Sequence, residues 1–263
     1  MSAVAAVSRR SRWPVLRDMT IELVIRELRL RYRRTTVGLA WSFAYPVGQV
    51  IVLSFIFTVV LPTHINKYSA FVSIGVLVWN WFQSSLVMAS TAITGNRELV
   101  RRPGFPSVVL PVSTVAVNLV LFLMAFPAMV IVVLWQGGQP GIGTALLPLA
   151  IAVQYLLTLG ISYFVASLNV RFRDTQQLVA LLLLLFFFVT PIFYSSASVP
   201  SDYLWLYDLN PMATLLDVYR AALLQGELPH VTRLVLVGAV AALTVLIGHR
   251  FFVRASSSFA EEI

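Results

Sequence analysis

Few side chains in this sequence could do catalytic or metal-binding chemistry, and they are scattered. There is no cysteine, the three histidines are isolated from one another, and the acidic residues form no cluster with metal-ligand spacing. We therefore predict no catalytic residues and no metal site. A membrane-embedded enzyme, such as a lipid-phosphate transferase, would need paired acids or a His/Asp set. No recognisable motif surrounds the acids of the segment over 195–232, which are Asp202, Asp208, Asp217 and Glu227.

A nucleotide-binding loop is also not expected. A P-loop needs a glycine-rich turn that ends in Gly-Lys-Ser/Thr and wraps the phosphates. The sole lysine, Lys67, lies instead in the segment Ile65-Asn-Lys-Tyr68. The chain cannot bind ATP by that route, and ATP-driven work would require a second polypeptide. We expect no cofactor in this chain.

The composition is that of a membrane protein. Charged residues make up 11% of the chain and hydrophobic residues 59%, whereas a soluble domain carries about 25% charged residues. Too few groups remain to cover a water-facing surface. The net charge of +8 comes almost wholly from arginine. Because the arginines border apolar stretches, we do not expect a nucleic-acid partner.

Long uncharged stretches predict the membrane-spanning helices. A span needs roughly 20 apolar residues as a helix. The positive-inside rule with a cytoplasmic N-terminus puts all but three of the 19 basic residues on the inner side, the exceptions being Lys67, Arg220 and Arg233. Both termini are then cytoplasmic. We predict an all-α membrane protein with six transmembrane helices near 39–61, 71–94, 108–135, 142–168, 178–194 and 234–253.

The spans contain almost no ionisable residue, and none at a span centre. An ion-driven carrier usually keeps such a residue in mid-membrane, so we expect the energy to come from outside the membrane domain. The predicted parts are a cytoplasmic N-terminus over 1–34, a transmembrane domain over 35–255 and a cytoplasmic tail over 256–263.

The segment from Trp13 to Arg34 is too charged to span. Read as a helix, it separates a charged face, which also holds Asp18 and Glu22, from a neighbouring apolar one, although Leu23 and Leu30 fall off the apolar stripe. It is either an amphipathic helix that grips anionic head groups or a solvated basic helix that sets topology. The basic residues singled out are Arg26, Arg29, Arg33 and Arg34, and the apolar ones are Ile21, Val24, Ile25, Leu28 and Tyr32.

The second inner loop, residues 95–106, predicts a short helix. Asn96 could cap it with Glu98 in its first turn, and Pro103 and Pro106 would end it. Such a helix between two long spans could be a handle for a partner protein, and an ordinary positively charged loop is the alternative. The residues concerned are Asn96, Arg97, Glu98, Leu99, Val100, Arg101 and Arg102.

The outer segment over 195–232 is long but apolar, so it could not float in water. Short helices that rest in or dip into the outer leaflet fit it best. Asn210-Pro211 begins the second of these, and Asp217 and Arg220 lie at i,i+3, the spacing of an ion pair on one helix face.

Several short segments together resemble one family, the membrane subunits of type-2 ABC transporters that export lipid-linked polysaccharides such as O-antigen, teichoic acid and capsule. They follow the family order from about residue 20 to 255. The segments are Arg26–Arg34 with Gly38-Leu-Ala-Trp41 and Pro46, Asn96–Pro106 with Val109-Leu-Pro111, Asn169–Asp174, Pro191-Ile-Phe-Tyr194, and Asn210-Pro-Met212 with Tyr219-Arg220.

The resemblance implies a homodimer in the bacterial inner membrane, paired with two copies of a separate ATPase that binds ATP and Mg. The N-terminal helix would lie at the inner interface, residues 95–106 would be the coupling helix, and the cargo would be a lipid-linked glycan. A type-2 ABC permease for a small lipophilic drug or a lipid is the alternative. The outer segment would form two re-entrant gate helices, with Tyr203, Trp205, Asn210, Pro211, Tyr219 and Arg220.

Aromatic residues are dense on the first, second and fifth predicted spans. Sugars offer C–H faces that pack on rings, and a sliding polymer needs many weak contacts. Lipid-facing bulk and interfacial belts are the other interpretation. The candidates for a channel lining are Trp41, Phe43, Tyr45, Phe187, Phe193 and Tyr194.

Overall fold

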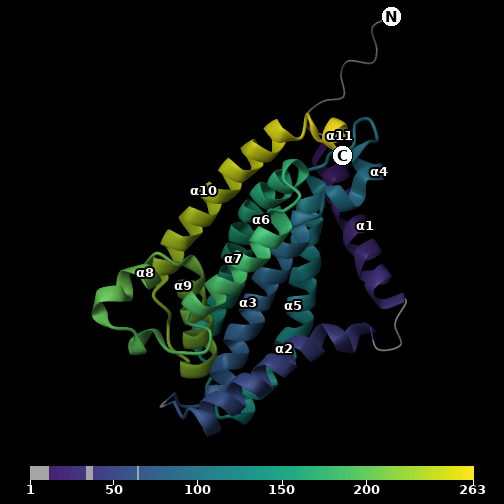
Figure 1. Ribbon diagram of the computed structural model, residues 1–263. Helices are drawn as coiled ribbons and strands as arrows, with labels where there is room; N and C mark the ends of the chain where they lie inside the picture. The colour runs from purple at the N-terminus through teal and green to yellow at the C-terminus, as the bar shows by residue number, and fades with distance from the viewer. Residues whose placement is uncertain (1–11, 34–37, 64) are drawn as a thin grey trace, which may run out of the picture.

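The computed structural model describes residues 12–33, 38–63 and 65–263, and within them the chain is a bundle of helices (Figure 1). The longer helices are α1 (Arg12–Arg33), α2 (Gly38–Phe55), α3 (Tyr68–Ser90), α5 (Val109–Trp135), α6 (Leu147–Arg171), α7 (Thr175–Val189) and α10 (Val231–Ala255). The shorter ones are α4 (Arg97–Val100), α8 (Leu204–Asp208), α9 (Pro211–Arg220) and α11 (Phe259–Glu262).

All six predicted spans are helical, and the prediction of an all-α multi-pass membrane protein is confirmed. Among the described residues, four helices are long and apolar enough to cross a membrane: α3, α5, the helix over Ile142–Arg171 and α10. The helices over Ala44–Val60 and Thr175–Val189 are apolar but shorter. Six crossings therefore stay a prediction.

The fifth apolar segment leaves the helical conformation earlier than its hydropathy indicated. Helix α7 ends at Val189, and Thr190 is extended with φ −80° and ψ 136°. Pro191 causes this end, because a proline disfavours the helical conformation in the residue before it and cannot donate a helical N–H. We call residues 190–194 the α7 break.

Helix α3 lies at the centre of the bundle, in contact with α2, α5, α6, α7 and α9. Its Trp79 is fully buried. In Figure 1, α3, α5 and α6 run side by side, whereas α2 crosses the lower end of the bundle obliquely. Helix α2 thus covers α3 without lying along it.

Helices α6 and α10 cross at two glycines. A Cβ on Gly248 would come within 2.4 Å of the Gly160 carbonyl oxygen, and one on Gly160 within 2.7 Å of the backbone at Thr244 and Val245. Small residues let membrane helices approach this closely. The crossing holds α10 against the bundle along its length, with its C-terminal end at the side where α4 and α11 lie (Figure 1).

Candidate functional site

The predicted coupling segment forms a short helix with two different sides. A 3-10 turn over Thr94–Asn96 leads into α4. Leu99 and Val100 are half-buried against an apolar cluster of the bundle. The charged residues face outward and are exposed: Arg97, Glu98, Arg101 and Arg102. The arrangement presents positive charge on a firmly packed support.

The predicted capping role of Asn96 is wrong. The Asn96 side chain makes no cap hydrogen bond to α4. Its Nδ2 donates instead to the Ala92 carbonyl at 2.9 Å, and its Oδ1 accepts from Arg26 Nη2 at 3.4 Å. Because the chain enters α4 through a 3-10 turn, the Asn96 backbone (φ −119°, ψ 41°) is not in the extended conformation typical of a capping residue.

Apolar residues from distant parts of the chain form the support under α4. Ile93, Val170 and Phe252 are buried together, and Phe259 of the C-terminal tail joins them. Helix α11, in that tail, contacts α4. We call this group the cytoplasmic cluster, after the side of the membrane that the sequence predicts for residues 95–106. Sequence reasoning missed the tail; the lone Phe259 among small and acidic residues was the available signal.

Asn169 also joins two elements at this end of the bundle, through one long hydrogen bond. It is 4% exposed, and its Nδ2 donates to Thr94 Oγ1 at 3.4 Å. Its Oδ1 is buried without a partner among the described residues. This residue opens the segment Asn169–Asp174, which sequence analysis singled out without giving it a position beside the loop.

The N-terminal helix contacts the bundle through a residue that lies off its predicted apolar stripe. Helix α1 packs on α5, and Leu23, which fell off the predicted stripe, packs on the cytoplasmic cluster. Ile21 and Ile25, which belonged to the stripe, are 48% and 42% exposed. Arg26 and Arg29 are exposed as predicted. Arg34 and the side chain of Arg33 lie outside the described residues.

At the other end of the bundle, side chains from other helices satisfy the carbonyls of the α7 break. Arg220 Nη1 and Nη2 donate to the carbonyls of Pro191 and Ile192 at 2.7 and 2.8 Å. Tyr68 Oη donates to the Phe193 carbonyl at 2.9 Å. Away from water an unpaired carbonyl is costly, so these bonds stabilise the break.

Arg220 does not form the predicted pair with Asp217. Among the described residues, the ion pairs with an N···O distance of 4.0 Å or less do not include Asp217 with Arg220. Arg220 is 5% exposed and its Cζ stands 3.5 Å from the centre of the Phe71 ring. Helix α9 turns this side chain into the bundle, so the i,i+3 spacing describes the helix but not its contacts.

The start of α9 is as predicted. Asn210 is the N-cap, with Oδ1 accepting from Met212 N at 3.0 Å, and Pro211 is the first helical residue. Asn210 Nδ2 also donates to Thr190 Oγ1 at 3.0 Å, which joins the cap to the α7 break. Tyr219 Oη donates to Gln154 Oε1 at 3.1 Å deep in the bundle.

The predicted gate residues divide into two groups. Asn210, Tyr219 and Arg220 are buried around the α7 break and α6. Tyr203 and Trp205 are both 57% exposed, on and beside the short helix α8. The outer segment is therefore a buried helix plus an exposed apolar turn, not two similar surface helices.

Three of the channel candidates lie in one aromatic cluster. Phe187 and Phe193 have ring centroids 5.8 Å apart, and Phe193 and Tyr194 are 5.1 Å apart. Phe193 also stacks on Phe57 at 5.5 Å, and Phe187 meets Trp79 at 6.0 Å. The side chains of Trp41 and Phe43 lie outside the described residues.

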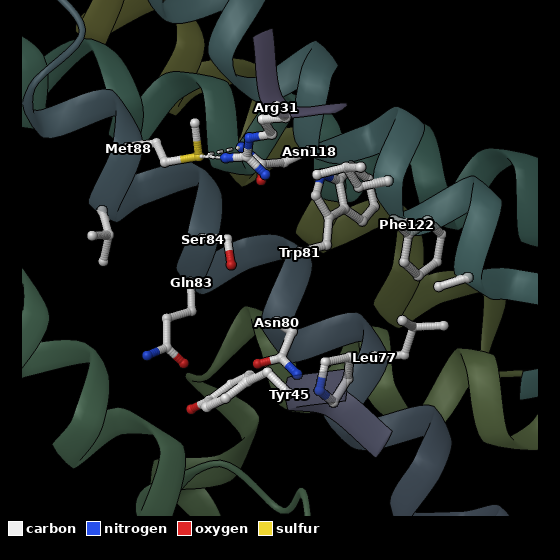
Figure 2. A pocket seen from close by; sticks show the side chains of 14 residues that line it. Arg31, Tyr45, Leu77, Asn80, Trp81, Gln83, Ser84, Met88, Asn118 and Phe122 are labelled. Carbon is white, nitrogen blue, oxygen red and sulfur yellow. Dashed lines mark hydrogen bonds between the residues drawn. The ribbon is translucent and has the colours of Figure 1, made fainter. Parts of the chain in front are cut away.

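Tyr45 stands apart from that cluster, at a cavity between α1, α2, α3 and α5 (Figure 2). The cavity has a volume of about 440 Å³. Its lining combines aromatic, amide and hydroxyl groups with Arg31 of α1. Sequence analysis named Tyr45 but missed Arg31, because the basic face it drew on α1 ran through Arg26 and Arg29.

The chain is similar to known membrane proteins over nearly its whole length. Residues 20–224 match the family model described as ABC-2 type transporter. The chain is 34% identical over 249 residues to the O-antigen export system permease protein RfbA of Myxococcus xanthus, covering 94% of this chain and 96% of that protein.

Two further relatives extend the comparison. The protein of the same name from Klebsiella pneumoniae is 30% identical over 245 residues, covering 93% of this chain and 94% of its own length. The polysialic acid transport protein KpsM of Escherichia coli is 25% identical over 243 residues, covering 89% and 92%.

Proposed function

Because this chain belongs to the ABC-2 type transporter family, we propose that it is the permease subunit of an ATP-driven exporter of a lipid-linked polysaccharide. The observation that carries the proposal is its 34% identity, over nearly the full length of both chains, to a permease named for O-antigen export. The KpsM relative is named for another polysaccharide, polysialic acid. A small lipophilic cargo is not favoured.

The proposed assembly is two copies of this chain and two copies of an ATPase, in the bacterial inner membrane. ATP and Mg²⁺ would bind to the ATPase. All six apolar helices would cross, with both termini on the cytoplasmic side. Leu178, Leu181, Leu182 and Leu185 of α7 are each more than half exposed on a single subunit, so this face is open to lipid or to a second copy.

We place the ATPase contact at α4. Leu99 and Val100 pack on the cytoplasmic cluster, so a push on α4 is transmitted to α6 and α10 through Val170 and Phe252. The outward arginines suit an acidic surface on the partner. A merely solvated loop would need no such apolar support.

Charge reversal tests this contact. Arg101→Glu with Arg102→Glu, in the complex reconstituted with its ATPase, should lower export and cargo-stimulated ATP hydrolysis at least about tenfold, since like charges across an interface cost several kcal/mol. Arg250→Glu with Arg254→Glu, both exposed on α10, makes the same charge change at the same end of the bundle but outside α4. Undiminished export and ATP hydrolysis in the first variant would count against the assignment.

A further inference from the structure

The C-terminal tail, residues 256–263, packs beside α4, although the contact proposed above does not use it. Helix α11, which lies in this tail, contacts both α4 and α6. Figure 1 shows α4 and α11 at the same end of the bundle. Phe259 is 1% exposed, and its ring meets that of Phe252 edge-on, with the two centroids 5.3 Å apart. A partner that docks on α4 is therefore next to α11.

The tail has an apolar side and an acidic side. Phe259 and Ile263, four residues apart, pack on the cytoplasmic cluster. Glu261 and Glu262 are exposed. The Ser258 carbonyl accepts hydrogen bonds from Glu261 N at 3.0 Å and from Glu262 N at 3.1 Å. This turn and its buried anchor fix the backbone of both acidic residues, so less conformational entropy is lost when a partner binds them.

Opposite charges lie on the two neighbouring helices without pairing. Arg101 and Arg102 of α4 are exposed, as are the two glutamates of α11. The ion pairs of the described residues include neither glutamate. Because these carboxylates stay unpaired beside a basic helix, they are available to a partner that brings its own positive charge.

The tail does not suit a membrane surface. Residues 256–263 contain no lysine or arginine, and their two acidic residues are those of α11. The cytoplasmic leaflet carries anionic lipids, which attract basic segments and therefore repel an acidic one. A basic protein surface is the partner that this charge favours.

We propose that α11 is a second docking element for the ATPase beside α4, and that the ATPase meets it with a basic surface. The inference rests on the proposed function, because it takes the partner of α4 to be the ATPase. The ATPase then presents an acidic surface to Arg101 and Arg102, and a basic surface to Glu261 and Glu262. This pattern fixes the orientation of the ATPase on the permease, since the reverse orientation would bring like charges together.

Charge reversal on α11 tests the proposal through the affinity for the ATPase. The wild-type permease and its variants, in nanodiscs of phosphatidylcholine, are titrated with the purified, fluorescently labelled ATPase. Glu261→Arg with Glu262→Arg should weaken binding at least about tenfold in about 0.05 M salt, because like charges then face each other. The loss should be smaller in about 1 M salt, where the Debye length is about 3 Å.

The matched control makes the same charge change in the outer segment. Asp202→Arg with Glu227→Arg alters two exposed acidic residues near the start of α10, whereas the tail follows its end. This variant should bind the ATPase like the wild type. Size-exclusion profiles and thermal unfolding establish that each variant is folded.

A charge swap separates oriented docking from attraction by net charge. Arg101→Glu and Arg102→Glu combined with Glu261→Arg and Glu262→Arg keep the net charge of +8. We expect this variant to bind more weakly than either pair of reversals alone, because both contacts are then repulsive. Binding restored to the wild-type level would show that net charge attracts the ATPase, and would overturn the inference.

Cysteine labelling gives a second measurement that does not depend on charge reversal. The chain contains no cysteine, so a single introduced cysteine can be labelled selectively, and nanodiscs leave both faces of the protein accessible. Saturating ATPase should slow maleimide labelling of Glu262→Cys. Labelling of Asp202→Cys, in the outer segment, should keep its rate in the free permease.

Two further results would overturn the role of α11. They are wild-type affinity in the variant with both glutamates reversed, and labelling of Glu262→Cys that bound ATPase does not slow. If Arg101→Glu with Arg102→Glu still loses binding in that case, the proposed function and the α4 contact stand and only the role of α11 fails. A wild-type permease that neither binds the ATPase nor exports a glycan would refute both.

Discussion

The two ends of the bundle are held together by different forces. At one end, α4 rests on buried apolar side chains, and the hydrogen bonds beside it, Arg26 to Asn96 and Asn169 to Thr94, are 3.4 Å long. At the α7 break, bonds of 2.7 to 2.9 Å run from Arg220 and Tyr68 to a backbone that has left the helix, and Asn210 donates to the Thr190 hydroxyl at 3.0 Å. Burial of area supports the first, and specific hydrogen bonds support the second.

Because the forces differ, the two ends should tolerate different substitutions. Apolar burial is additive and non-directional, so α4 keeps its support when a single polar group changes. A carbonyl in the α7 break has one partner, and losing that partner leaves the carbonyl unpaired where water is scarce. Single polar substitutions should therefore destabilise the α7 break and spare the end that holds α4.

The largest effect is expected at Arg220. Arg220→Leu leaves the carbonyls of Pro191 and Ile192 without their partners, and at about 1–3 kcal/mol for each buried unpaired group the loss is about 2–6 kcal/mol. The free energy of unfolding of Arg220→Lys should lie between those of the wild type and Arg220→Leu, because an ammonium lacks the planar fork of donors that reaches both carbonyls. Denaturant unfolding of the purified protein in one detergent measures the free energy of unfolding.

Arg233 provides the control for Arg220. It is on α10, its side chain is 56% exposed, and it pairs with Asp208 at 3.3 Å. Arg233→Leu should change stability by no more than about 1 kcal/mol, as for other exposed ion pairs. Equal stability in the Leu variants of Arg220 and Arg233 would show that hydrogen bonds do not hold the α7 break.

Hydropathy predicted where the helices form, but not what their ends contact. The uncharged stretches located all six apolar helices, because burial in lipid requires long apolar runs whatever the packing. The end of α7 was placed at Tyr194, although Pro191 already indicated an earlier end. A proline disfavours the helical conformation in the residue before it, which predicts the earlier end, but the apolar composition of residues 190–194 favoured a longer span.

The contacts of Arg220 and Arg31 could not be predicted from spacing. Spacing paired Arg220 with Asp217, whereas its partners lie 28 and 29 residues earlier in the chain. The basic face drawn on α1 omitted Arg31, because the side of α1 that meets the bundle depends on how it packs on α5. Pairings between helices depend on tertiary packing, which periodicity in one helix does not contain.

Gly75 tests the close fit at the α7 break without removing a hydrogen-bonding group. A Cβ there would lie 2.7 Å from the Ile192 carbonyl oxygen and 3.0 Å from Arg220 Nη2. Gly75→Ala should therefore push the break away from α3 and cost about 1–3 kcal/mol of unfolding free energy, as overpacking does.

The matched change is Gly48→Ala in α2, where an added Cβ meets nothing within 4 Å. Alanine is the better helix former by about 1 kcal/mol, so this variant should be as stable as the wild type or slightly more so. Thermal unfolding of both proteins side by side gives the comparison. If the Gly75→Ala and Gly48→Ala proteins unfold at the same temperature, the α7 break accommodates an added methyl group.

The smallest effects are expected from a pair of buried asparagines, one at each end. Asn210 uses both ends of its amide, on Met212 N and Thr190 Oγ1 at 3.0 Å each. Asn169 makes one long bond to Thr94 and leaves its oxygen unpaired. Asn210→Leu should cost about 1–2 kcal/mol through the lost cap, whereas Asn169→Leu should be nearly neutral, because the amide was only half satisfied. The same substitution at equal burial then reports only on hydrogen bonding, and a larger loss at Asn169 would reverse the assignment of forces to the two ends.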